Sequence, residues 1–458
     1  MNQPSLPLEL HQLIIDIIID DAGLAQQAVY REGEDTRGSL GACSLVCKNW
    51  HAHTLRYIFH RVHFTLVDSD EDLTRRAELF RLLEVNPLIR RCIRRAHIYL
   101  SISVSPDGVE ALCNAISPVE TFSLVLESSQ LDLPSPSPLD SLHPILSTSH
   151  LRNLSIWSRY FPTRMLEGLA NLQSLTLEGV KVVVFNHKAR DGREDGVWRS
   201  STLERLVVTP ARRFLAKIGS VADSNIGLSA FFEHLKYLDI AFDTDEMALN
   251  SSWNILLARW KRLETLIVRW HVLGEFVSTH QFGATADTDR FALTENGVSF
   301  LEMCRMLPWE SFQGLRSLSY YIFYRVMPSE RLFNAEVDPS ALIFAGPSSL
   351  PQLQNLHVTY YNRDVLYEAN ELNMSLDAIY LHNLNRTIEE RNSFPSLRNF
   401  HTNVTCFVSC DGELVLEEDE LAQLVVDRLP AIFRVGGRKE THGWIASIES
   451  VVKTVTWS

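Results

Sequence analysis

One phrase recurs through most of the chain: an apolar residue, two variable residues, an apolar residue, one variable residue and a last apolar residue. A Leu-x-x-Leu spacing also occurs on helices, but the alternation that ends most copies is typical of half-buried strands. Successive copies begin 21 to 52 residues apart, and a tenth copy, LRNFHT (397–402), is degenerate. The nine clear copies are IRRAHI (93–98), VETFSL (119–124), LRNLSI (151–156), LQSLTL (172–177), LERLVV (203–208), LKYLDI (235–240), LETLIV (263–268), LRSLSY (315–320) and LQNLHV (353–358).

Each repeat is predicted to contribute one short strand and one return segment, and neither can bury its apolar face alone. Stacked repeats would share a continuous core and form a parallel sheet along one side. The expected fold class is therefore α/β, with a loose period and polar insertions such as the Pro/Ser-rich residues 128–141. A helix over residues 417–433 is predicted to cap the last repeat.

Alternation along each strand sends the variable residues to the face opposite the leucines. In a horseshoe of such repeats this face is concave and meets whatever is bound. Aromatic and Arg side chains in such a row are typical of protein-binding surfaces, although each one taken singly could be an ordinary strand residue. The candidates for binding a protein target are Trp157, Arg205, Tyr237, Asp239, Ile267, Arg269, Tyr321, Asn355 and His357.

The N-terminal part of the chain has the pattern of a separate helical unit. Apolar residues from Leu6 to Ile18 follow the spacing of one helix face, and a second helix is predicted from an N-cap at Ser39 through Phe59. The stretch ACSLVC (42–47) puts small or apolar side chains all round this second helix, which must then be covered on more than one side. A unit this small buries too little surface to do so. We therefore expect a partner protein to cover the remaining face.

Two cysteines and two histidines in this second helix raise the question of a metal site. Cys43, Cys47 and His51 lie four residues apart, so on one straight helix they spread over about 12 Å. A tetrahedral zinc ion needs ligands that converge, and no second Cys/His pair with ligand spacing stands nearby in the sequence. Packed, reduced thiols are the simpler interpretation. No metal and no cofactor are expected.

The sequence motifs LPLEL (6–10) and CSLVCKNW (43–50), in this order, resemble the F-box. This helical module docks substrate receptors onto the adaptor subunit of SCF-type (cullin–RING) ubiquitin ligases. The segment between the two helices is longer than is usual in the family and is similar to inserts in fungal F-box proteins. The resemblance implies an adaptor-binding surface made by Leu6, Pro7, Leu10, Ile14, Leu45, Val46 and Trp50.

The repeats resemble the leucine-rich repeats of F-box proteins, with one departure. Three residues after the last apolar position, where the family has Asn or Cys, this chain has residues such as Arg159, Val180 and Tyr361. Irregular turns are therefore expected. The predicted layout is a small all-α F-box module (1–64), a helical bridge (65–90) and a degenerate leucine-rich-repeat-like solenoid (91–458).

The bridge is predicted to be a helix that opens at Ser69 and ends before Pro87. Its apolar residues fall at a helical spacing, so one side should face a core. The residues expected on that side are Leu73, Ala77, Phe80 and Leu83.

Both resemblances imply a substrate-recognition subunit of an SCF-type E3 ubiquitin ligase. Its partners would be the ligase adaptor, cullin through that adaptor, and a protein target. Such a subunit acts by proximity and needs no catalytic residues of its own. The alternatives are a scaffold outside the ligase and an enzyme with an unrecognised site. The sequence has no phosphate-binding glycine loop, G-x-S-x-G, H-E-x-x-H or Rossmann fingerprint, so we expect no enzyme.

Composition further limits the classes of protein to which the chain could belong. The formal net charge of −13 argues against nucleic-acid binding, which depends on clustered Lys and Arg. No run of about 18 apolar residues exists to span a bilayer. Seven scattered cysteines fit free thiols in a reducing compartment, so the chain is expected in the cytoplasm and/or the nucleus.

Overall fold

The computed structural model divides into two compact units, which are described separately. Unit 1 comprises residues 1–177 and 184–196, and unit 2 comprises residues 178–183 and 197–458. The predicted boundaries at residues 64 and 90 both lie within unit 1. The structure describes residues 42–45, 48–66, 70–101, 106–116, 118–127, 141–146, 148–162, 165, 169, 171–180, 182–184, 202–209, 214–215, 231–243, 257, 260–271, 307–324, 350–365, 396–409, 438–441 and 444–455.

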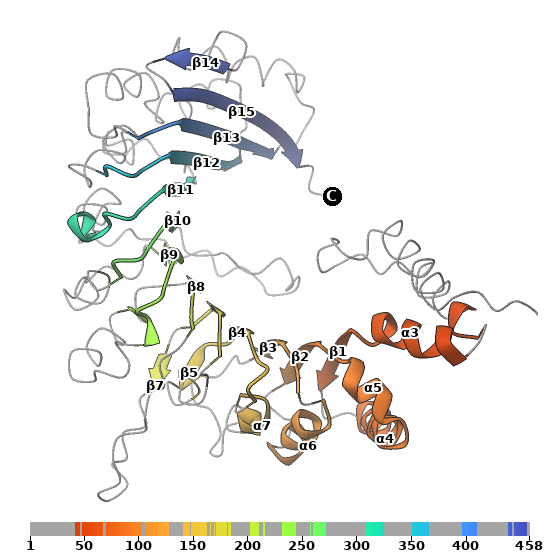
Figure 1. Cartoon of the computed structure of the whole chain (residues 1–458). Coiled ribbons are helices and arrows are strands. Elements are labelled where there is room, and N and C mark those ends of the chain that lie inside the picture. Colours follow the sequence, from red (N-terminus) through yellow and green to blue (C-terminus); the bar gives the residue numbers. More distant parts are fainter. Residues whose placement is uncertain are drawn as a thin grey trace, which may run out of the picture. The chain divides into compact units, whose positions relative to one another are not determined.

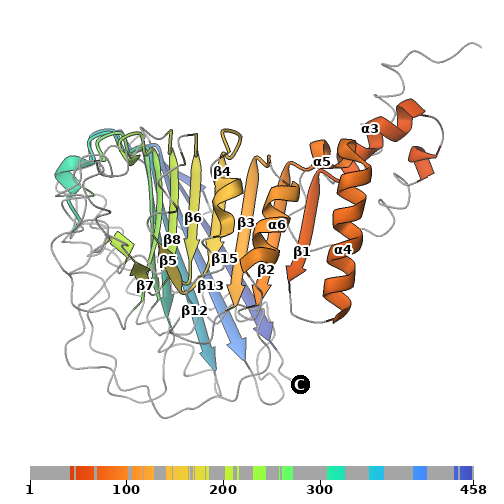
Figure 2. The ribbon, with the colours of Figure 1, turned by 90° about the horizontal axis from the view of Figure 1, so that it is seen from below.

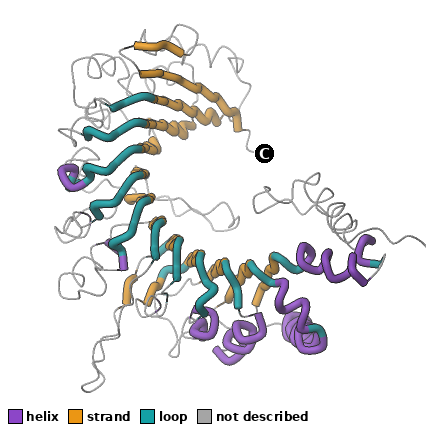
Figure 3. Tube along the Cα trace, in the orientation of Figure 1, coloured by secondary structure: helices purple, strands orange, loops and turns teal. Residues whose placement is uncertain are grey.

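Most helices of the described residues belong to unit 1 (Figures 1 and 3). They are α3 (Lys48–Ile58), α4 (Asp70–Val85), α5 (Pro87–Cys92), α6 (Pro106–Ile116) and α7 (His143–Leu146). Helix α5 starts with a proline, whose missing N–H costs nothing in a first turn, and Asn86 caps it by accepting a 3.2 Å bond from the N–H of Leu88. None of the helices in the described ranges has the length and apolar character needed to cross a bilayer.

Helix α4 lies where the sequence predicted a helix between Ser69 and Pro87, but its buried side differs in part from the prediction. It begins at Asp70 and ends before Pro87, as the sequence predicted. Leu83 is buried, but Ala77 is exposed, so the expected buried side was too broad. The side chain of Leu73 is outside the part of the chain that the structure describes.

The second N-terminal helix is not continuous, which corrects the prediction of one helix from Ser39 through Phe59. Residues 42–44 are helical, a turn follows at Leu45, and α3 starts at Lys48. The N–H of Leu45 donates to the carbonyl of Ala42, three residues earlier, and this bond closes a tight turn. The start of the predicted helix at Ser39 lies outside the described residues.

The strands of unit 1 are parallel neighbours in chain order (Figure 2). They are β1 (Arg61–Leu66), β2 (Arg95–Ser101), β3 (Thr121–Glu127), β4 (Asn153–Trp157) and β6 (Ser174–Glu178), whose last residue is assigned to unit 2. The short β5 (Tyr160–Pro162) follows β4 in the chain but is not a strand of this sheet. β1 pairs with β2 in full register. Its sequence, preceded by FH, has the same apolar spacing as the other repeats, but it was read as the end of the N-terminal unit.

Unit 2 continues the pattern with longer strands and few described helical turns (Figure 3). The parallel strands are β8 (Arg205–Thr209), β9 (Tyr237–Asp243), β10 (Thr265–His271), β11 (Ser317–Tyr324), β12 (Asn355–Val365), β13 (Asn399–Ser409) and β15 (Trp444–Val455). The short β7 (Val182–Val184) precedes them, η3 (Trp309–Ser311) precedes β11, and β14 (Arg438–Thr441) pairs antiparallel with β15. All ten phrases therefore form strands, and the predicted α/β fold with a parallel sheet is confirmed. The predicted capping helix over 417–433 lies outside the described residues.

The apolar positions of the phrases form the core of unit 2. The second leucine of each phrase stacks on its counterpart in the next strand, for example Leu266 beside Leu238 and Leu318. These leucines are 0–1% exposed, so the leucine spacing alone sets which face of the strands is buried. The residues of this row are Leu206, Leu238, Leu266, Leu318 and Leu356.

The repeats are joined at the start of the strands through backbone carbonyls. The carbonyl of Glu204 accepts bonds of 2.9 Å from the N–H groups of both Lys236 and Tyr237. The same pair of hydrogen bonds to one carbonyl recurs at each following repeat. It also occurs in unit 1, at the carbonyls of His60, Arg94, Glu120 and Arg152. We call this the carbonyl ladder; in unit 2 it runs through Glu204, Lys236, Glu264, Arg316 and Gln354.

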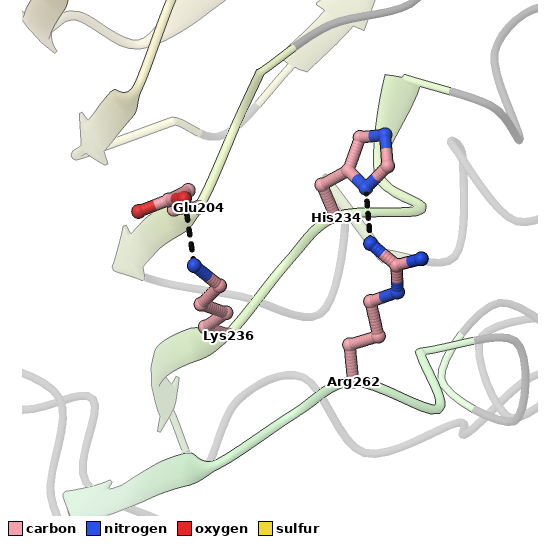
Figure 4. A network of polar contacts seen from close by, with 4 residues as sticks. All are labelled: Glu204, His234, Lys236 and Arg262. Carbon is pink, nitrogen blue, oxygen red and sulfur yellow. Dashed lines mark hydrogen bonds and ion pairs between the residues drawn. The ribbon is translucent and has the colours of Figure 1, made fainter.

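Charged side chains alternate in sign along the carbonyl ladder. Lys236 lies 2.8 Å from Glu204, and Arg316 lies 3.9 Å from Glu264. Beside them, Nη1 of Arg262 donates to Nδ1 of His234 at 2.8 Å (Figure 4). These pairs are solvent-exposed, so each is worth no more than about 1 kcal/mol, and the backbone bonds carry the alignment.

Two histidines, His60 directly before β1 and His97 on β2, make unit 1 sensitive to acid. Burial lowers the pKa of His97, and the nearby charge of Arg61 lowers it further; burial and Arg95 lower the pKa of His60. The unfolded chain therefore binds protons more readily below about pH 6.5. Stability present at neutral pH should be lost as pH falls below that value, which is measured as a lower melting temperature at pH 5.5 than at pH 7.5.

The variant His97→Gln should reduce this fall. His51→Gln removes an exposed histidine from α3 and serves as its matched control. An unchanged melting temperature over this range, or equal effects of the two variants, would contradict the assignment.

Candidate functional site

Side chains of Arg, Tyr and Asp converge on the face of unit 2 opposite the leucine core. They come from the variable positions of four consecutive strands, β8 to β11. We call this set the guanidinium–tyrosine cluster, and it contains five of the predicted target-binding residues: Arg205, Tyr237, Asp239, Arg269 and Tyr321.

An ion pair between neighbouring strands is the centre of the cluster. Register places Asp239 opposite Ile267, so Arg269 stands two residues further along the same face, within reach of a long side chain. Nε and Nη2 of Arg269 donate to the two carboxylate oxygens of Asp239 at 2.8 and 2.7 Å. This bond raises the pKa of Arg269. The Asp239 side chain is only 3% exposed, whereas that of Arg269 is 38% exposed, so the predicted surface residue Asp239 is in fact covered.

Each guanidinium also lies against a tyrosine ring of the next strand. Arg205 is paired in register with Tyr237, and its guanidinium carbon is 3.9 Å from the ring centroid. Arg269 is paired with Tyr321 in the same way, at 5.0 Å. Cation–π contacts of this kind contribute roughly 0.5–2 kcal/mol and fix the orientation of the guanidinium plane.

Two histidines extend the polar face onto β12 and β13. The rings of Tyr321 and His357 have centroids 5.8 Å apart, and those of His357 and His401 are 4.7 Å apart. The Nδ2 of Asn399 donates to Oδ1 of Asn355 at 2.8 Å in the same pair of strands. His401 was missed because its phrase is degenerate, although the shared Asn-x-His of NLH and NFH marks it.

Burial shifts the acid–base behaviour of two groups at the cluster. It raises the pKa of Tyr237, and the charge of Asp239 adds to this, so the phenol is neutral at pH 7 and can donate a hydrogen bond. The Glu178 residue is exposed at the end of β6, yet partial loss of solvation raises its pKa, against the lowering influence of Arg269. Glu178, the last residue of β6, was not among the sequence candidates, although it holds the same position in its repeat as Arg269.

The remaining candidate residues are placed as follows. Trp157 belongs to unit 1, on β4, and is half-buried, whereas Ile267 and Asn355 are half-buried in unit 2. Of the implied adaptor-binding residues, Leu45 is 86% exposed and Trp50 is half-buried. Leu6, Pro7, Leu10, Ile14 and Val46 lie outside the described residues.

The described side chains are suited to binding a partner. The cysteine considered as a metal ligand, Cys43, has a free thiol. Throughout the described ranges, no three His, Cys, Asp or Glu side chains gather as metal ligands would. What the cluster does offer is fixed charge, aromatic surface and hydrogen-bond donors on a row of strands.

Comparisons with known proteins do not assign this chain to a family. No family model matches the sequence, and no curated protein matches it. A comparison of structures finds a chain in the crystal structure of the Rad7 and Elc1 complex in yeast, with 12% sequence identity over 86% of this chain and 88% of that chain. The TM-score is 0.30, so this likeness carries no argument.

Proposed function

We propose that the chain is the substrate-recognition subunit of an SCF-type (cullin–RING) E3 ubiquitin ligase. The N-terminal F-box-like segment docks on the ligase adaptor, and the polar face of unit 2 holds a protein target. The target is brought near the ubiquitin-loaded enzyme, which raises the effective concentration of its lysines. The chain itself supplies no catalytic group in this mechanism.

The observation that carries the target-binding part is the guanidinium–tyrosine cluster. Its members come from separate repeats, yet each guanidinium is oriented by a ring or a carboxylate of a neighbouring strand. Arg and Tyr held in fixed conformations lose little entropy on binding and are the residue types that dominate protein–protein contacts. This arrangement suits recognition of a protein surface.

The adaptor-docking part is supported by the two F-box-like sequence motifs and by Leu45. This leucine lies inside the second motif, CSLVCKNW, and is 86% exposed, although exposed leucine surface is costly unless a partner covers it. We expect that Leu45→Asp in the full-length chain weakens adaptor binding by at least about tenfold, as for a buried interface anchor. Calorimetric titration of the purified chain with purified adaptor measures this.

The matched control is Val85→Asp, because Val85 on α4 is 78% exposed and lies outside the two F-box-like motifs. This variant should bind the adaptor normally, and both variants should melt at the temperature of the unmodified chain. Normal binding by Leu45→Asp would contradict docking through this segment. Retained binding by a chain in which Leu6, Pro7 and Trp50 are all replaced with Ala would do so as well.

A further inference from the structure

Two guanidinium groups of the guanidinium–tyrosine cluster, those of Arg205 and Arg269, reach solvent, even though the chain is acidic overall. The carboxylate of Asp239 is covered and lies beneath the guanidinium that it binds, whereas the Arg269 side chain is 38% exposed. Nε and Nη2 of Arg269 donate to Asp239, whereas Nη1 donates to none of the described residues. The positive group therefore faces outward and keeps donors for a ligand.

Arg205 adds a second outward guanidinium. It is exposed and held over the ring of Tyr237, and it forms no ion pair with the described residues. A guanidinium fixed in this way loses less conformational entropy when it meets an acceptor. The neutral phenol of Tyr237 beside it can donate to the same acceptor.

We propose that the polar face of unit 2 binds its target through an acidic segment, with one Asp or Glu carboxylate at Arg205 and another at Arg269. This rests on the target-binding part of the proposed function. Charge complementarity selects the segment, because a carboxylate on each outward guanidinium replaces water with charge-assisted hydrogen bonds. Glu178, near Arg269 on the β6 side, repels acids and limits the patch in that direction.

The arrangement favours two separate carboxylates over one phosphate group. A phosphate dianion is best held by several forked donors that converge on it. Here one fork edge of Arg269 is already occupied by Asp239. In addition, Arg205 and Arg269 stand on strands separated by β9, about 10 Å apart across the sheet, and the register places Arg269 four residues, about 13 Å, further along the strand direction. Each guanidinium therefore meets its own acidic side chain.

Short fluorescein-labelled peptides test this in the full-length chain. Each contains two Glu residues separated by a varying number of Gly, Ser, Leu and Tyr residues; matched peptides carry Gln or phosphoserine at the same positions. Fluorescence anisotropy should show binding of at least one Glu spacing, weakened by added salt and absent for its Gln counterpart. Arg205→Gln should weaken that binding by about tenfold.

The matched control is Arg316→Gln, which removes an exposed guanidinium from the carbonyl ladder of the same unit. It should bind the Glu peptide as the unmodified chain does. The proposal is overturned if no Glu peptide binds, if Gln peptides bind equally well, if phosphoserine peptides bind more tightly than Glu peptides, or if Arg316→Gln weakens binding as much as Arg205→Gln.

Adaptor binding of the same proteins separates this inference from the proposed function. Arg205→Gln should bind the adaptor normally, and Leu45→Asp should bind the Glu peptide normally. A chain that binds Glu peptides but no adaptor would refute the ligase role and leave the acidic-segment site standing. A chain that binds the adaptor but no Glu peptide would refute the site alone.

Discussion

Replacing Leu175 with Asp is expected to unfold unit 1. Leu175 occupies the second leucine position of its repeat, on β6, and is 0% exposed. An Asp there would either bury an unpaired carboxylate or force the strand away from the core, at a cost of about 5 kcal/mol or more. A domain is stable by only about 5–15 kcal/mol, so most or all of the stability would be lost. Circular dichroism in rising urea, with limited proteolysis, measures the loss.

Thr176→Asp is the matched control because the same charge is added one residue later. Thr176 points to the opposite face of β6 and is half-exposed. The substitution should change the free energy of unfolding by about 1 kcal/mol or less. Equal destabilisation by the two variants would contradict the assignment of the two faces.

Replacing Asp239 with Ala is expected to destabilise unit 2 by about 2 kcal/mol. The loss leaves Arg269 without the carboxylate that binds its Nε and Nη2, and removing one partner of a buried pair is costly. The figure is below the usual range for fully buried pairs because the Arg269 side chain is 38% exposed and water can solvate it in part. Urea unfolding of the full-length chain measures the change.

The double variant Asp239→Ala with Arg269→Ala provides the test of coupling. Because no charge is then left unpaired, it should be less destabilised than the sum of the two single variants. Strict additivity would show that the ion pair contributes nothing, and an unchanged stability of Asp239→Ala would contradict its burial.

The buried face of the fold could be predicted because leucine spacing reports burial directly. Strand residues alternate between two faces, so the phrase alone identifies rows such as Leu238, Leu266 and Leu318. The same reasoning correctly placed Arg205 and Tyr237 on the other face. It could have identified β1 as well, since FHRVHF has the same spacing, but that segment had already been assigned to the N-terminal helices.

The contacts within the candidate site could not be predicted in the same way. Asp239 and Arg269 are 30 residues apart in the chain, and their bond depends on which residues of adjacent repeats are aligned. A single repeat contains no information about that alignment. Likewise, the turn at Leu45, whose N–H donates to the carbonyl of Ala42, interrupts a segment that the sequence predicts to be one helix.

The carbonyl ladder has a consequence for how this chain can change. Its bonds use only main-chain groups, so any residue except proline can donate there. Strand starts in unit 2 are separated by connections of very different length, yet each makes the same pair of bonds, and lengthening a loop costs little entropy. The segments between strands can therefore be exchanged or extended while the sheet beneath stays aligned, which leaves each repeat free to acquire new recognition loops on an unchanged frame.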